Sequence, residues 1–90
     1  MKKKTTEIER LLAENLRRER KGRDWSRKDL AQKAKIQEAI IAKTESLISF
    51  PTAKNFEKLA RALQVEPYQL LMPKSDLDLL RAVKNLALKR

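Results

Sequence analysis

The sequence contains no cysteine and no histidine, and its single glycine is Gly22. Without cysteine or histidine the chain has no disulfide, no thiol chemistry and none of the usual zinc ligands, so we expect no metal site and no cofactor. One glycine cannot build a glycine-rich phosphate loop, and no pair of carboxylates in the pattern suggests a catalytic acid and base. An enzyme is therefore the weakest functional hypothesis.

Long apolar runs are also missing. The apolar runs are far shorter than the roughly 20 residues that span a bilayer, and charged residues follow the basic N-terminus where a signal peptide would have an apolar core. We therefore expect a soluble, cytoplasmic protein with no membrane partner. Ninety residues are enough for one domain with a modest core, and we expect no second domain.

Positive charge is what the chain has in excess. Lysine and arginine number 22 against 12 acidic residues, which gives a formal charge of +10. On so small a surface this excess favours a polyanionic partner, and nucleic acid is the first candidate. Charge alone does not separate DNA from RNA or from an acidic protein. Residues 1–5 precede any apolar periodicity and carry Lys2, Lys3 and Lys4, so they are predicted to be a flexible basic arm, either a solvated tail or a contact to DNA.

Helical spacing of apolar residues along the chain predicts an all-α fold. Helices are expected over residues 7–21, from a cap at Ser26, over 37–47, from a cap at Thr52, over 67–72, and over 75–89 with a cap formed by Ser75 and Asp78. We expect Gly22 to reverse the chain after the first helix. Trp25, the only tryptophan, is interpreted as a core residue between the first two helices.

The stretch from Ser26 to Glu45 reads as two short helices joined by a tight turn. Leu30, Ile36 and Ile41 have the spacing of buried residues, and Ala31 is small enough to let two helices cross closely. With the pattern Ser-x-x-x-Leu-Ala and the proline before the next helix, residues 15–71 resemble the phage-repressor (Cro and repressor type, XRE-like) helix-turn-helix family. The resemblance implies a compact five-helix DNA-binding bundle, here over residues 6–72, followed by a C-terminal helix over 75–90.

The resemblance also assigns roles to individual positions. It places base reading on one face of the third helix, at Gln37, Glu38, Ala39, Ala42 and Lys43. It implies phosphate contacts around that helix, at Arg27, Lys28, Ser46, Lys54 and Asn55. Arg20 and Glu45 match a structural ion pair between the first and third helices. The chemistry is compatible, because Glu38 can accept from cytosine N4, the alanines can meet thymine methyl groups, and Lys43 can reach guanine or phosphate.

The sequence departs from the family at several positions. The family usually has glycine where Asp24 and Lys35 stand, and a lysine in the left-handed conformation of this turn costs on the order of 1 kcal/mol, so the turn and the tilt of the third helix are expected to change. Ile40 and Leu47 widen the apolar face that Ile48 and other residues form on the third helix. That width indicates either a partner or cover by the C-terminal helix.

The C-terminal helix carries two apolar seams. Leu79, Val83 and Leu86 form one, and the second consists of Leu77, Leu80, Ala87 and Leu88. We expect one seam to pack on the domain and the Leu79, Val83, Leu86 seam to join a second copy, giving a homodimer that reads a roughly palindromic site.

The leading hypothesis is sequence-specific binding of double-stranded DNA by a small prokaryotic or phage transcriptional regulator associated with the nucleoid, with no small-molecule site evident. The alternative is a repressor-like scaffold whose third and last helices bind a protein partner, as in an antitoxin or a polymerase-associated factor. Weak base-reading chemistry and the missing turn glycine favour the alternative.

Overall fold

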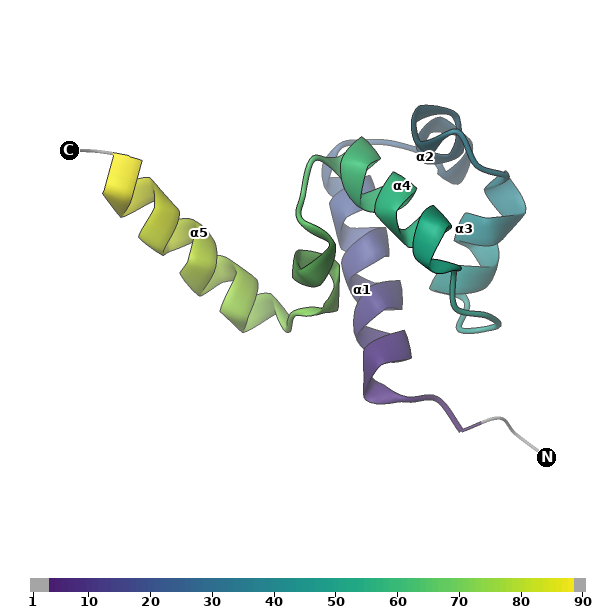
Figure 1. Cartoon of the computed structure of the whole chain (residues 1–90), viewed down its shortest axis with the longest axis horizontal. Helices are drawn as coiled ribbons and strands as arrows, with labels where there is room; N and C mark the ends of the chain where they lie inside the picture. The colour runs from purple at the N-terminus through teal and green to yellow at the C-terminus, as the bar shows by residue number, and fades with distance from the viewer. Residues whose placement is uncertain (1–3, 89–90) are drawn as a thin grey trace.

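The computed structural model describes residues 4–88, and these residues are helical apart from the connections. The elements are α1 (Glu7–Gly22), α2 (Arg27–Ala34), α3 (Glu38–Glu45), α4 (Ala53–Leu63), the short 3-10 helix η1 (Pro67–Leu71) and α5 (Lys74–Leu88) (Figure 1). The described residues contain no strand, and the predicted all-α fold is confirmed. Within them, no helix combines the length and the apolar character needed to cross a membrane.

Side-chain caps start three of the helices. The hydroxyl of Thr6 accepts from the amide of Glu9 at 3.1 Å, while the Glu9 carboxylate accepts from the Thr6 amide at 3.0 Å. Ser26 and Asp29 make the same reciprocal pair at 3.0 and 2.9 Å. Because these bonds satisfy amides that no helical carbonyl can reach, they fix where α1 and α2 begin.

One apolar core lies between α1, the α2–α3 pair, α4 and η1. α2 packs on both α3 and α4, and α1 contacts α3 and η1. The fully or almost fully buried side chains of this core are Leu12, Leu16, Leu30, Ala31, Ala34, Ile41, Leu59, Ala60, Leu63 and Leu70. Trp25 packs against the core but stays half-buried, so its interpretation as a core residue holds only for part of the ring.

Two of the turn predictions were wrong. Asp24, with φ 57°, reverses the chain after α1, whereas Gly22 is the last residue of that helix and is not among the residues with positive φ. Lys35 keeps the left-handed conformation that the family turn requires, with φ 59° and ψ 46°, so the turn is strained rather than altered. The amide of Ile36 still donates to the carbonyl of Ala31 at 3.1 Å, which brings the chain back toward α2.

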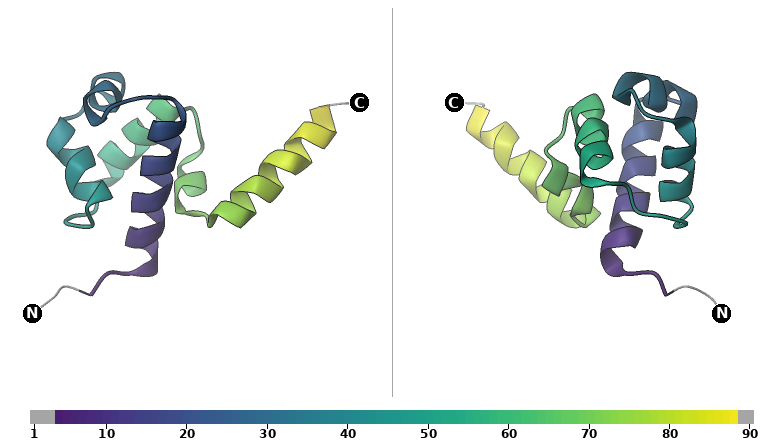
Figure 2. Two further views of the ribbon diagram at one scale, coloured as in Figure 1. Left: turned by 180° about the vertical axis from the view of Figure 1, so that it is seen from behind. Right: turned by 45° about the vertical axis from the view of Figure 1, so that its right-hand side comes forward.

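α3 is shorter and its flank more open than the sequence indicated. It ends at Glu45, Ser46 caps it, and Leu47 turns the chain with φ 62°, where the prediction extended the helix to residue 47. Ile48, expected on the buried face, is 63% exposed because it lies beyond this turn. The C-terminal helix does not cover the apolar face of α3, as one of the two interpretations had it, because α5 lies on the far side of α1 from α3 (Figures 1 and 2).

α5 leaves the bundle as an arm. It begins at Lys74, one residue before the predicted cap, and Asp78 accepts a hydrogen bond from Lys74 Nζ at 2.8 Å in place of the predicted bond to Ser75. Leu77 is buried, while the helix beyond residue 80 is exposed as far as residue 87. The arm predicted at residues 1–5 lies mostly outside the described residues, as does the end of the C-terminal helix beyond Leu88.

Candidate nucleic-acid interface

A buried ion pair fixes α3 against α1. Arg20 donates from Nε and Nη2 to the two carboxylate oxygens of Glu45 at 2.8 and 2.9 Å, and from Nη1 to the carbonyl of Trp25 at 2.9 Å. The Glu45 side chain is 0% exposed and that of Arg20 is 9% exposed. The ion pair predicted at these positions is present, and its two-pronged geometry orients the third helix, because any rotation of α3 would break it.

A second arginine reaches the same carboxylate. Arg27, in the first turn of α2, donates to Glu45 Oε1 at 3.2 Å. Burial alone would raise the pKa of Glu45, but the hydrogen bonds and charges of Arg20 and Arg27 lower it below its ordinary value. Glu45 is therefore charged at neutral pH and ties α1, α2 and α3 together.

The exposed face of α3 carries the residues predicted to read bases. Ile41 and Thr44 are buried, and the opposite side of the helix presents Ala39 and Lys43 to solvent, with Ala42 half-buried beside them. Gln37 and Glu38 are exposed at the helix start. The structure therefore brings all five predicted side chains to the helix start and the side turned away from the core. Their roles as base contacts stay a prediction.

The predicted phosphate contacts surround this face. Lys28, Ser46 and Lys54 are exposed, at the start of α2, the end of α3 and the start of α4. Asn55 is half-buried, and its backbone N–H donates to Thr52 Oγ1 at 3.2 Å as part of the cap of α4. Arg27 is held by Glu45 yet keeps 37% of its side chain exposed. No acidic residue occurs between Ser46 and Phe56, so the segment that borders α3 is uncharged or cationic.

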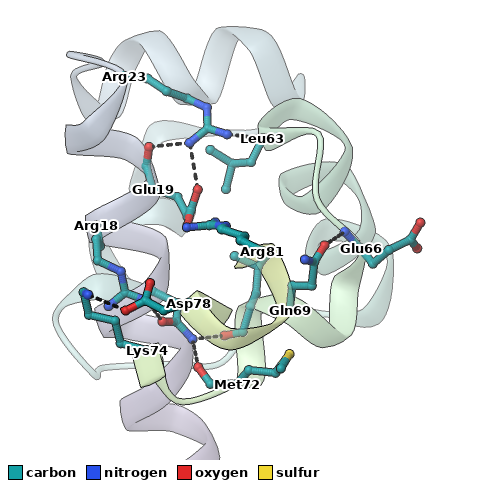
Figure 3. A network of polar contacts seen from close by, with 12 residues as sticks. Arg18, Glu19, Arg23, Leu63, Glu66, Gln69, Met72, Lys74, Asp78 and Arg81 are labelled. Atoms are coloured by element: carbon teal, nitrogen blue, oxygen red, sulfur yellow. Dashed lines mark hydrogen bonds and ion pairs between the residues drawn. The ribbon is translucent and has the colours of Figure 1, made fainter. Parts of the chain in front are cut away.

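Sequence reasoning missed a second polar network, which positions α5 (Figure 3). Glu19 is almost fully buried and accepts from Arg23 Nη1 at 2.9 Å and from Arg81 Nη2 of α5 at 2.8 Å. Burial alone would raise the pKa of Glu19, but Arg81 and Arg23 lower it below its ordinary value. Asn15, also buried, donates to the carbonyls of Leu70 and Met72, each at 2.8 Å, just before α5 begins.

The helical register held a signal for these residues. Asn15 and Glu19 each lie three positions after a core leucine of α1, so they fall on the same buried stripe as Leu12 and Leu16. A polar residue on such a stripe needs a partner, although its identity does not follow from the spacing. The described residues include no cluster of three or more acidic, cysteine or histidine side chains able to hold a metal ion.

Comparison with known proteins places the chain among regulators. The Helix-turn-helix family model matches residues 16–70. A hypothetical transcription factor, NHTF, from Neisseria superposes with a TM-score of 0.74 at 30% identity, covering 88% of this chain and 95% of that one. The restriction-modification controller protein C.AhdI from Aeromonas hydrophila superposes with a TM-score of 0.65 at 26% identity, covering 69% and 94%. No curated protein sequence matches the chain.

Proposed function

Because the chain belongs to the Cro- and repressor-type helix-turn-helix family, we propose that this DNA-binding transcriptional regulator reads its site with the exposed face of α3. The observation that carries the proposal is the buried Arg20–Glu45 pair, which holds α3 so that Ala39 and Lys43 point into solvent. A rigid, outward-facing helix on a protein of charge +10 suits entry into a major groove.

The proposed mechanism divides the contacts into two kinds. Residues of α3 touch base edges: Lys43 donates to guanine, Glu38 accepts from cytosine, and Ala39 and Ala42 meet thymine methyl groups. Cations and amides around α3 bind phosphates and set the register of the helix on the duplex. Arg27 belongs both to the Glu45 ion pairs and to the proposed phosphate contacts, since part of its guanidinium holds Glu45 and the exposed remainder of the side chain faces outward.

The proposal includes a two-fold dimer joined through α5. Leu79, Val83 and Leu86 are 65%, 54% and 72% exposed, which is costly for a row of apolar side chains. Leu77 and Arg81 attach the other side of α5 to the bundle, so this seam points away from the bundle. A dimer of this kind would read two half-sites about 10 base pairs apart, or a multiple of that spacing, in opposite orientation.

The alternative of a scaffold without DNA reading is not favoured, because the family match and both structural neighbours are regulators. The same relatives point to a non-enzymatic protein. As a regulator of transcription, the protein is proposed to work in the cytoplasm, next to the nucleoid.

Selection of bound sequences from a random duplex pool tests the proposal. The expected result is an enriched motif with two inverted half-sites, bound at least about a thousandfold more tightly than random duplex at physiological salt. Enrichment without any common motif would contradict base reading. An enriched single half-site would retain base reading and reject the dimer.

A further inference from the structure

A cationic groove lies where the C-terminal end of α2 crosses α4. It has a volume of about 270 Å³ and is lined by Lys33, Ala34, Lys35, Lys58, Arg61 and Ala62. Two small alanines lie among its four cations, half-buried Ala62 and almost fully buried Ala34. None of the lining residues is acidic, although Glu57 of α4 lines the neighbouring hollows beside Arg61.

The four cations form no ion pair with a described carboxylate, although the charge of Lys33 helps to lower the pKa of Asp29, one turn earlier in α2. Arg20, Arg23, Arg27 and Arg81 each contact a carboxylate, whereas the groove residues make no ion pair with any described residue. Lys33 is held in place by the Trp25 ring, whose centroid is 4.8 Å from its ammonium nitrogen. Four like charges around one hollow repel each other, and an anion placed among them would be stabilised.

Lys35 adds a backbone argument to the charge argument. It has φ 59°, a conformation that costs a non-glycine residue on the order of 1 kcal/mol and costs glycine nothing. Strained residues of this kind cluster at functional sites, although Asp24, Leu47 and Gln64 share this conformation outside the groove. In the structure, the Lys35 side chain lines the groove.

The groove shares no residue with the contacts proposed for DNA, but it adjoins one of them, because Lys54 lines a neighbouring hollow together with Lys58 and Arg61. Arg27 and Lys54 lie at the N-terminal ends of α2 and α4, and the groove lies at the C-terminal ends of the same helices. Seven residues, or about 10 Å of helix, separate Arg27 from Ala34 and Lys54 from Arg61. A duplex seated on α3 and on those two N-termini therefore comes nearest to the groove at Lys58, one turn after Lys54, and lies farther from Lys33 and Arg61.

We propose that the groove docks an acidic segment of a partner protein while the regulator is bound to DNA. Carboxylates spaced along one or two turns of such a segment would pair with Lys33, Lys35, Lys58 and Arg61, and small apolar side chains would meet Ala34 and Ala62. A polypeptide fits better than a second stretch of DNA backbone, because the apolar floor offers nothing to a phosphate. The proposal rests on the proposed function only for the DNA-bound state.

A labelled hexaglutamate peptide tests the groove, with binding followed by fluorescence anisotropy at low salt on the free protein and on its complex with a selected duplex. The groove variant is Lys58→Glu with Arg61→Glu. The matched control is Arg17→Glu with Lys21→Glu, which makes the same charge change at exposed positions of α1. We expect the groove variant to bind the peptide at least about tenfold more weakly than the control does, in both states. The two variants should bind DNA alike, with equal salt dependence.

Three results would overturn the proposal. The first is that the wild type binds no peptide, and the second is that both variants lose peptide affinity equally. The third is a larger drop of the DNA salt slope in the groove variant, which would assign the groove to phosphates. If the charge reversals unfold the protein, Lys58→Gln with Arg61→Gln is measured against Arg17→Gln with Lys21→Gln. If the wild type binds no DNA, the proposed function is rejected. Titration of the free protein with the peptide would still test the proposal about the groove.

Discussion

Lys43 is the only long cationic side chain on the exposed face of α3. If it reads a base, Lys43→Ala should cost about 1–3 kcal/mol of binding free energy and relax sequence preference at one position of each half-site. Titration of the selected duplex and its single-base variants measures both effects, with exposed Lys21→Ala as the control. A uniform loss on every duplex would instead make Lys43 a phosphate contact.

The two buried glutamates predict how stability depends on pH. Glu45 and Glu19 have a lower pKa in the folded protein than in the unfolded chain, so the unfolded state binds more protons and acid favours it. Their stabilisation is fully present above the unfolded value of about 4.3 and is lost as pH falls through the lowered folded values.

Urea unfolding at a series of pH values should therefore give a free energy of unfolding that declines below about pH 4.3. Glu45→Gln should be less stable at pH 7 and decline less steeply in acid, because one of the carboxylates with a lowered pKa is gone. A slope in acid equal to that of the wild type would contradict the role assigned to Glu45.

At the residue scale, the resemblance to the family predicted more than the residues alone did. The Arg20–Glu45 pair was expected because both positions match the family, and the structure contains it. Glu19 and Arg81 lie 62 positions apart, and nothing in the local sequence of either indicates the other. Their pairing depends on where α5 leaves the bundle, which is a property of the tertiary packing.

The α2–α3 turn provides a test at the scale of the element. Lys35→Gly should raise the free energy of unfolding by about 0.5–1 kcal/mol, because relief of the left-handed strain exceeds the entropy that glycine adds to the unfolded chain. Lys33→Gly, inside α2, should lower it by about 1 kcal/mol and serves as the contrast. Denaturant midpoints that fall in both variants would show that Lys35 bears no strain.

Helix starts were more predictable than helix ends. The Thr6–Glu9 and Ser26–Asp29 pairs are local patterns, and both form as expected. Four connections turn at non-glycine residues with positive φ, which are Asp24, Lys35, Leu47 and Gln64. Aspartate tolerates this conformation, but the identities of Lys35, Leu47 and Gln64 gave little sign that the chain would turn there. The Ser75–Asp78 pattern failed because Lys74, one turn before Asp78, supplies a charged partner for its carboxylate.

At the scale of the whole molecule, the proposed dimer depends on α5. Val83→Glu with Leu86→Glu should give a monomer by sedimentation velocity at micromolar concentration, where the wild type should be dimeric. The control is Lys84→Glu, which makes a similar charge change on the side of α5 away from the seam. A wild-type protein that is monomeric in the free state and on DNA would reject this interface.

The direction in which α5 leaves the bundle could not be predicted from the sequence. Two apolar seams were recognised, but which one meets the bundle depends on the burial of Leu77. It also depends on the contact between Glu19 and Arg81, two residues that Figure 3 labels. The groove between α2 and α4 could not be predicted from the sequence for the same reason, because its four cations come from segments more than 20 residues apart.

The most direct test of the account asks what lies against the exposed face of α3. The chain has no cysteine, so Ala39→Cys can carry a DNA-cleaving iron chelate at one defined position, with exposed Arg17→Cys of α1 as the reference. On the selected duplex, we predict strand cuts from position 39 that are confined to a few base pairs of each half-site and are offset between strands as expected for the major groove. Cuts from position 39 that are no stronger and no more localised than those from position 17 would contradict it.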